Sequence, residues 1–400
     1  MKNIIFLCLL SIIIVLANCT DSPDSAYESR HQKRVEKRAT LAAKSRVGAL
    51  PLQVKSPADN PISKEKIALG KSLFYDPILS GDKDVACVTC HHPSTGYAEF
   101  RDLSIGVNGK GLHGQRRFKF PNAIPFVKRN SQTILNTAFN GIALAEEYDP
   151  VAAPMFWDVR AKGLEAQALE PIKSFEEMRG AHYGEDEILT EVIHRLQAIP
   201  TYQALFMEAF NEPDAINVAN LGKAIAAFER SLVTNNSRFD QYMRGDRNAI
   251  SRSEKHGFDL FKKVGCTNCH NGPMFSDFKM HVLGVPENDK LPKPDLGFED
   301  QYSFRTPSLR NLRFTEPYMH NGKFTSLLEV LEFYEDISMR KVRNPALTTA
   351  QLDPLVKELK IRVKDMRPII SFLNTLNDEN FDKTIPEAVP SGLAVGGDIQ

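Results

Sequence analysis

The sequence predicts a mainly α-helical protein built from two similar halves. Alternation of apolar and polar residues with a period of two, which marks strands, is scarce. Apolar residues recur instead at helical spacing, in residues 221–232 of the first half and residues 369–376 of the second. Residues 70–74 (GKSLF) and 257–261 (GFDLF) each precede a cysteine motif. Both halves therefore follow one plan of helix, loop and motif.

The helix before the first motif has clear limits in the sequence. Ser63 is a suitable N-cap for a helix that runs to Phe74, and the Asp76-Pro77 pair ends it. A loop with Gly81 then leads to the motif. The chain is expected to divide into an N-terminal unit of residues 56–245, a C-terminal unit of residues 246–380 and an extended tail of residues 381–400.

Two copies of Cys-x-x-Cys-His stand at equivalent places, at residues 87–91 (CVTCH) and 266–270 (CTNCH). This spacing lets two thioether bonds reach one porphyrin edge while the histidine binds the iron. One copy alone is also compatible with a zinc or redox motif. Two copies predict two covalently bound haem c groups, and hence two cytochrome c-like haem domains packed across an interface. The attachment residues are then Cys87, Cys90, Cys266 and Cys269, and the iron ligands are His91 and His270.

The N-terminus carries an export signal. Residues 4–17 are apolar, which is signal-peptide length and short for a membrane span. The sequence LANC at residues 16–19 resembles a lipobox, so residues 1–19 are expected to be a lipoprotein signal and Cys19 the lipid anchor in the periplasm. Ordinary secretion is the alternative. The polar, basic residues 20–55 are expected to form a tether.

The overall charge is balanced, with 50 basic and 50 acidic residues. Nucleic acid is therefore not an expected partner, because its binding needs a basic surface. A local patch that docks a small redox protein remains compatible with this balance.

Two segments, residues 304–311 (FRTPSLRN) and 317–322 (PYMHNG), resemble the bacterial dihaem cytochrome c peroxidase family, which includes the MauG enzymes. The resemblance extends over about residues 60 to 380. It implies a peroxidatic first haem and an electron-transferring second haem, with Trp157 between them. It also implies that Glu177 is the acid–base residue, with Glu176 as the alternative one position away, and that Gln167 and Pro171 lie beside it.

The resemblance implies a calcium ion as well. Asn130 is expected to bind it through its side-chain oxygen, and Thr315 and Pro317 through backbone carbonyls. Oxygen ligands of this kind suit a hard cation. Members of the family are often dimeric, which makes a homodimer one option for this chain by analogy.

Two departures from the common family pattern concern the sixth iron ligands. No histidine occurs in residues 105–109, where many members carry one, and His113 is out of register. The first haem is therefore expected to be open. The position that usually holds methionine is Tyr334, as in MauG enzymes, so Tyr334 is expected to bind the second haem. The alternative ligands are Met339 and Met280.

The expected function is peroxide reduction in the periplasm, with electrons from a small cytochrome c or cupredoxin. A MauG-like enzyme that oxidises side chains of a partner protein is the second hypothesis, and Tyr334 favours it. A dihaem electron carrier without catalysis is the third, and it requires two six-coordinate haems.

Overall fold

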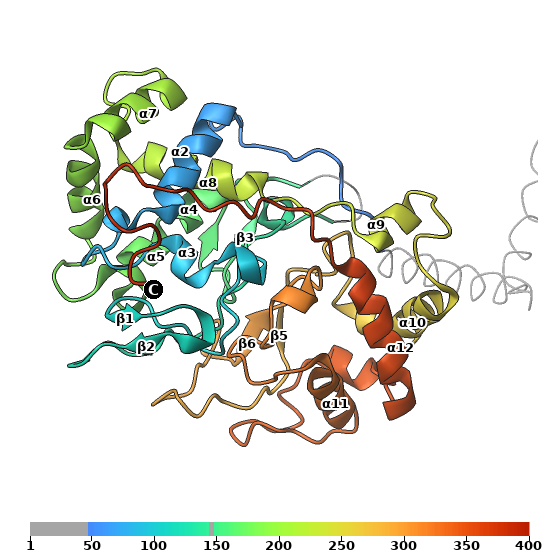
Figure 1. The fold of residues 1–400 in the computed structure, drawn as a ribbon. Helices are drawn as coiled ribbons and strands as arrows, with labels where there is room; N and C mark the ends of the chain where they lie inside the picture. The colour runs from blue at the N-terminus through green and yellow to red at the C-terminus, as the bar shows by residue number, and fades with distance from the viewer. Residues whose placement is uncertain (1–46, 144–147, 400) are drawn as a thin grey trace, which may run out of the picture. The chain divides into compact units, whose positions relative to one another are not determined.

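The computed structural model describes residues 47–143 and 148–399 of the chain. It confirms the prediction of a mainly α-helical protein (Figure 1). The α-helices are α2 (Lys64–Tyr75), α3 (Cys87–Cys90), α4 (Leu164–Gln167), α5 (Glu170–Lys173), α6 (Ile188–Gln197), α7 (Pro200–Phe210), α8 (Val218–Ser231), α9 (Arg238–Met243), α10 (Arg252–Lys263), α11 (Leu327–Ser338) and α12 (Val363–Leu373). Among the described residues, none of the helices has the length and apolar character needed to cross a membrane. The signal peptide, Cys19 and residues 20–46 of the expected tether lie outside these ranges.

Strands in the described ranges are short and form antiparallel pairs. The pairs are β1 (Gly109–Lys110) with β2 (Arg117–Phe118), β3 (Pro154–Met155) with β4 (Ala161–Lys162), and β5 (Met280–Val282) with β6 (Ser303–Arg305). They lie in the long connections between helices, so they shape loops and do not form a sheet core.

Local sequence signals explain where the helices begin and end. The Ser63 hydroxyl accepts a hydrogen bond from the backbone N–H of Lys66, and Asp76 is the C-cap of α2. Both agree with the limits expected from the sequence. Ser251 and Glu254 form a capping box at the start of α10, and Ser326 and Glu329 form one at the start of α11.

The repeat visible in the sequence becomes a repeated helix crossing. In the first half α2 packs on α8, and in the second α10 packs on α12 (Figure 1). A Cβ atom on Gly70 would lie 2.0 Å from the carbonyl oxygen of Ala224, and one on Gly257 would lie 1.9 Å from that of Pro368. Each crossing therefore depends on a glycine that lets the two backbones approach.

The apolar core is divided in the same way. One cluster joins side chains of α2, α6, α7 and α8, including Leu73, Val192 and Phe206. Another joins side chains of α10 and α12 with Phe239 and Phe275. Two cores fit the expected pair of haem domains, while the domain boundaries themselves stay a prediction.

Both ends of the described chain pack more closely than the sequence suggested. Val47 and Leu50 fall inside the expected tether, yet both are buried. The tail is extended, as expected, but it lies along the first half (Figure 1). The N–H of Gly396 donates to the carbonyl of Tyr75 at 2.8 Å, and the Thr89 hydroxyl donates to the carbonyl of Gly396 at 3.1 Å. The sequence gives no signal for these tail contacts, because they are made largely by backbone groups.

The close contact of α10 with α12 at Gly257 predicts that a larger residue there destabilises the fold. Gly257→Ala is expected to lower the free energy of unfolding by about 1–3 kcal/mol, because α10 must move away from α12. Guanidinium unfolding of the haem-loaded protein measures this. Gly114→Ala is the control, since a Cβ atom there meets nothing within 4 Å. An equal loss in both variants would contradict the crossing argument.

Candidate functional site

The two histidines of the cysteine motifs are oriented in the same way. Nδ1 of His91 lies 3.0 Å from the carbonyl oxygen of Tyr97, and Nδ1 of His270 lies 2.9 Å from that of Phe275. A carbonyl oxygen only accepts, so Nδ1 carries the hydrogen in both rings. The lone pair of each Nε2 is then available for a metal, and the hydrogen bond makes the ring a better ligand.

A cavity of about 770 Å³ connects the two motifs. Cys90 and His91 line it on one side, and Cys266, Cys269 and His270 on the other. Burial raises the pKa of the Cys87 and Cys266 thiols to about 12 in each case. A redox Cys-x-x-Cys pair needs a lowered thiol pKa, so these cysteines fit covalent haem attachment better.

A further observation also fits haem. Arg305 lines the cavity, is 5% exposed and has no ion-pair partner within 4.0 Å in the described parts of the chain. Burial lowers its pKa to about 10, so it is still a cation at neutral pH. A buried cation of this kind suits an acidic group such as a haem propionate. The residues present therefore fit two haem groups.

Glu177 lies on the cavity in the one π-helical turn of the described residues, Phe175–Arg179. Burial raises the pKa of its carboxyl to about 7, while Arg160 acts in the opposite direction. Its charge also contributes to the raised pKa of Cys87 and Cys90, and it lines the same cavity as Cys90 and His91. Gln167, Pro171 and Glu176 line the same cavity. The structure thus brings the expected distal residues together.

Residues 105–109, which lack a histidine, pack against the Phe175–Arg179 turn. The N–H of Val107 donates to the carbonyl of Glu177 at 3.1 Å. His113 is held elsewhere, with Nδ1 3.1 Å from the carbonyl of Glu99 and Nε2 3.1 Å from the Ser94 hydroxyl, and it does not line the cavity. Both ring nitrogens of His113 therefore already have hydrogen-bond partners, and neither faces the cavity.

Tyr334 projects from α11 into the second side of the cavity. Burial, together with the nearby Cys269 and Cys266, raises the pKa of its hydroxyl. Within the described residues this hydroxyl makes no hydrogen bond to protein. Neither Met280 nor Met339 lines the cavity, and Met339 is 65% exposed. The geometry therefore favours the tyrosine over both alternative ligands.

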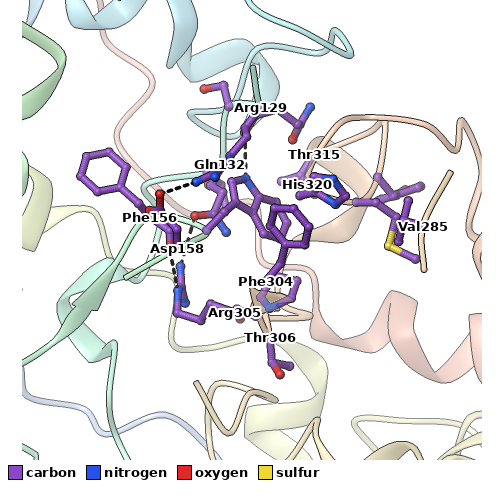
Figure 2. Close-up of a pocket in the computed structure, with 18 of the residues that line it drawn as sticks. Arg129, Gln132, Phe156, Asp158, Val285, Phe304, Arg305, Thr306, Thr315 and His320 are labelled. Carbon is purple, nitrogen blue, oxygen red and sulfur yellow. Dashed lines mark hydrogen bonds and ion pairs between the residues drawn. The ribbon is translucent and has the colours of Figure 1, made fainter. Parts of the chain in front are cut away.

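Trp157 is buried on the cavity wall and is fixed by backbone contacts. Its indole N–H donates to the carbonyl of Asn130 at 3.0 Å, and its carbonyl accepts from the N–H of Arg305 at 2.8 Å. Its neighbour Asp158 forms an ion pair with Arg129 at 2.7 Å (Figure 2). The ring of His320 lies edge-on, 6.5 Å from the indole.

In the described parts of the chain, the ring of His320 is held by stacking and not by a hydrogen bond at Nε2. The ring stacks on Phe304 with centroids 3.6 Å apart (Figure 2), and its Nε2 is buried without a partner among the described residues. Burial lowers its pKa to about 3, so the ring is neutral.

The three expected calcium ligands, Asn130, Thr315 and Pro317, all line the cavity. The side-chain amide of Asn130 donates to the carbonyl of Arg101 at 2.9 Å, which turns its Oδ1 the other way. That oxygen and the carbonyls of Thr315 and Pro317 accept no hydrogen bond within the described ranges. Three uncommitted oxygens are compatible with a hard cation.

Sequence reasoning missed one charged cluster close to the second motif. Nδ1 of His281 lies 2.7 Å from Asp353, and its Nε2 lies 3.0 Å from Asp277. Cys269, Asp277 and His281 lie close enough to hold a metal ion together. Among the described residues, no other group of three His, Cys, Asp or Glu side chains does so. Both ring nitrogens are already paired with carboxylates, so the cluster is better explained as a structural ion pair. The separation of Asp353 in sequence left no local signal for it.

Comparisons with known proteins agree with this site. A family model described as di-haem cytochrome c peroxidase matches residues 64–248. The chain is 34% identical over 342 residues to the methylamine utilization protein MauG of Methylorubrum extorquens, over 84% of this chain and 85% of that protein. It is also 34% identical over 358 residues to the cytochrome-c peroxidase IdrP1 of Pseudomonas sp. strain SCT, over 80% of this chain and 83% of that protein.

A solved structure supports the same assignment. A MauG-like protein associated with microbial copper homeostasis matches with a TM-score of 0.66 and 27% identity, over 82% of this chain and 95% of that chain. The relatives are matched along most of their length, and their names agree with the paired haem motifs. The chain therefore belongs to the dihaem cytochrome c peroxidase family, which supports two haem groups, and it is a peroxidase-type oxidoreductase.

Proposed function

We propose that this chain is a periplasmic enzyme that reduces hydrogen peroxide to two molecules of water, taking two electrons from a small cytochrome c or cupredoxin and two protons from solvent. The observation that carries this proposal is the placement of Glu177 on the cavity beside the first motif, with its pKa raised to about 7. An acid–base group works best when its pKa is near the working pH.

The side chains around Glu177 have separate roles in this proposal. As a carboxylate, Glu177 accepts the proton from one peroxide oxygen, and as an acid it returns that proton to the departing oxygen. The amide of Gln167 is available to orient peroxide, and Pro171 supplies an apolar wall that limits water. Haem, when bound, supplies the iron and the redox equivalents. Trp157, held by the bonds described above, provides a fixed aromatic ring between the two motifs.

A MauG-like oxidation of a partner protein is the second candidate function. Tyr334 is the observation that favours it, because a buried hydroxyl without a protein hydrogen bond is free to bind iron on the second side of the cavity. A stable oxidised state after peroxide addition, with no turnover by any small donor protein, would favour this candidate.

Lipid anchoring through Cys19, a calcium ion at Asn130, Thr315 and Pro317, and a homodimer complete the proposal. Electron entry is assigned to the second haem, and peroxide chemistry to the first.

The test of Glu177 uses Glu177→Gln. The rate constant for reaction with peroxide is expected to fall by about 10²–10⁴-fold, because the glutamine cannot accept a proton. In the wild-type protein this rate constant should rise with pH through about 7, as the base becomes deprotonated, and the variant should lose that rise. Stopped-flow measurement of this rate constant in the haem-loaded wild type and variant, across this pH range, tests the role of Glu177. Glu176→Gln is the matched variant, and a larger loss there would move the role to Glu176.

The ligand assignment is tested by Tyr334→Met. A thioether favours ferrous iron, whereas a phenolate favours ferric iron, so the reduction potential of the second haem is expected to rise. A spectroelectrochemical titration measures it. Met339→Leu should leave the potential unchanged, because Met339 is exposed and away from the cavity. An unchanged potential in Tyr334→Met would show that another residue binds the iron.

The calcium site is tested by Asn130→Ala. Loss of a side-chain ligand oxygen is expected to weaken calcium binding by about ten-fold or more, measured by calorimetry on chelator-treated protein. Thr315→Ala is the control, since only its backbone carbonyl is assigned to the ion. Equal affinity in Asn130→Ala and wild type would remove Asn130 from the site.

A further inference from the structure

Arg116 is a fully buried arginine whose hydrogen bonds all go to backbone carbonyls. Nε donates to Ile105 at 2.6 Å and Nη2 to Gly106 at 2.7 Å. Nη1 donates to Gly111 and to Asp398, at 3.0 Å in each case. Burying a guanidinium is costly, so its position between these carbonyls indicates that the loop conformation depends on it.

The loop that Arg116 holds lies directly against the Glu177 turn. A Cβ atom on Gly106 would lie 2.2 Å from the carbonyl oxygen of Glu177 and 2.3 Å from that of Glu176. The N–H of Val107 donates to the same Glu177 carbonyl at 3.1 Å. Residues 105–107 therefore fix the backbone of the residue whose side chain faces the cavity.

The C-terminal segment closes the other side of Arg116. The carbonyl of Asp398 accepts from the N–H of Gly111 at 3.0 Å as well as from Arg116. The N–H of Asp398 donates to the carbonyl of Asp84 at 2.9 Å. Lys119 bridges the Asp398 and Asp84 carboxylates at 2.8 and 3.2 Å. Arg116 is thus held by a segment that is distant in sequence.

We propose that Arg116 is a positioning residue for Glu177. The C-terminal segment holds Arg116 in place, and Arg116 in turn keeps residues 105–107 packed against the Phe175–Arg179 turn. This packing keeps the Glu177 carboxyl facing the cavity. This inference rests on the proposed role of Glu177 in peroxide reduction. A purely structural Arg116 would stabilise the fold without changing the behaviour of Glu177.

Loss of this support has a defined consequence. The groups that act on Glu177 are Arg160, Glu176, Glu170 and the Ser174 hydroxyl, and none of them belongs to the 105–107 loop. Burial is the main reason for its raised pKa. When the loop moves away, water replaces protein atoms, so the pKa falls towards the ordinary value of 4.5.

The experiment compares Arg116→Gln with wild type in the haem-loaded protein. Hydrogen–deuterium exchange is expected to show lost protection of the Val107 amide. An infrared titration of the Glu177 carboxyl, assigned with Glu177→Gln, should show its pKa lowered by about one unit. The peroxide rate constant should fall about ten-fold, and its rise with pH should move to lower pH.

Arg244→Gln is the control. Arg244 also donates to backbone carbonyls, those of Leu50 and Asn235, but to none in residues 105–107 and not to that of Arg116. It should leave Val107 protection and the Glu177 titration unchanged. If Arg116→Gln leaves both unchanged while Glu177→Gln is impaired, the inference about Arg116 is overturned and the proposed function stands. If Glu177→Gln reacts like wild type, both are overturned.

Gly106→Ala keeps the inference testable if Arg116→Gln does not fold. Its added Cβ atom displaces the loop from the Glu177 turn while the Arg116 guanidinium is kept. The same loss of Val107 protection and the same shift of the Glu177 titration are expected. In the double variant with Arg116→Gln the effects should not add, because both act through one contact. Full additivity, or an unshifted titration in Gly106→Ala, overturns the inference.

Discussion

A hydrogen bond from a buried imidazole to a backbone carbonyl determines where each metal ligand points, and the surrounding structure serves that bond. Tyr97 and Phe275 aim their carbonyls at His91 and His270, and both adopt a left-handed backbone, with φ of 55° and 53°. That conformation costs a bulky residue about 1–2 kcal/mol. The same conformation occurs at equivalent places in both halves. This indicates that orienting the histidine ring outweighs the cost of the left-handed backbone. The helix crossings at Gly70 and Gly257 then bring the apolar walls up to the oriented rings.

The two halves share this scaffold but differ in what faces the histidine. Beside the first motif a π-helical turn presents Glu177, a group that can exchange a proton near neutral pH. Beside the second motif a regular helix presents Tyr334, whose hydroxyl is kept protonated by burial. A π-helical turn widens the helix by one residue and is frequent at functional sites. Similar packing therefore places a carboxyl group that can exchange a proton on one side of the cavity and a tyrosine hydroxyl on the other.

Much of this architecture was predictable from the sequence, and the limits of prediction are physical. The caps of α2 and the helical periodicity are local signals, so the limits of α2 at Ser63 and Asp76 agree with the structure. The clamp around Arg116 was not found, because its contact with Asp398 joins residues 282 positions apart and uses only a backbone carbonyl. The burial of Val47 and Leu50 was missed for a different reason: the basic residues up to Arg46 dominate the composition of residues 20–55, although residues 47–54 (VGALPLQV) carry no charge.

Asn130 links several parts of the site that would otherwise be independent. Its N–H donates to the carbonyl of His320 at 2.7 Å, and its own carbonyl accepts from the Trp157 indole. Its side-chain amide is held by Arg101, and the remaining oxygen is the proposed calcium ligand. One residue thus connects the proposed ion site, the indole and the stacked His320 ring. A calcium ion bound at the proposed site would therefore act on Trp157 through the backbone of Asn130, without taking part in the chemistry.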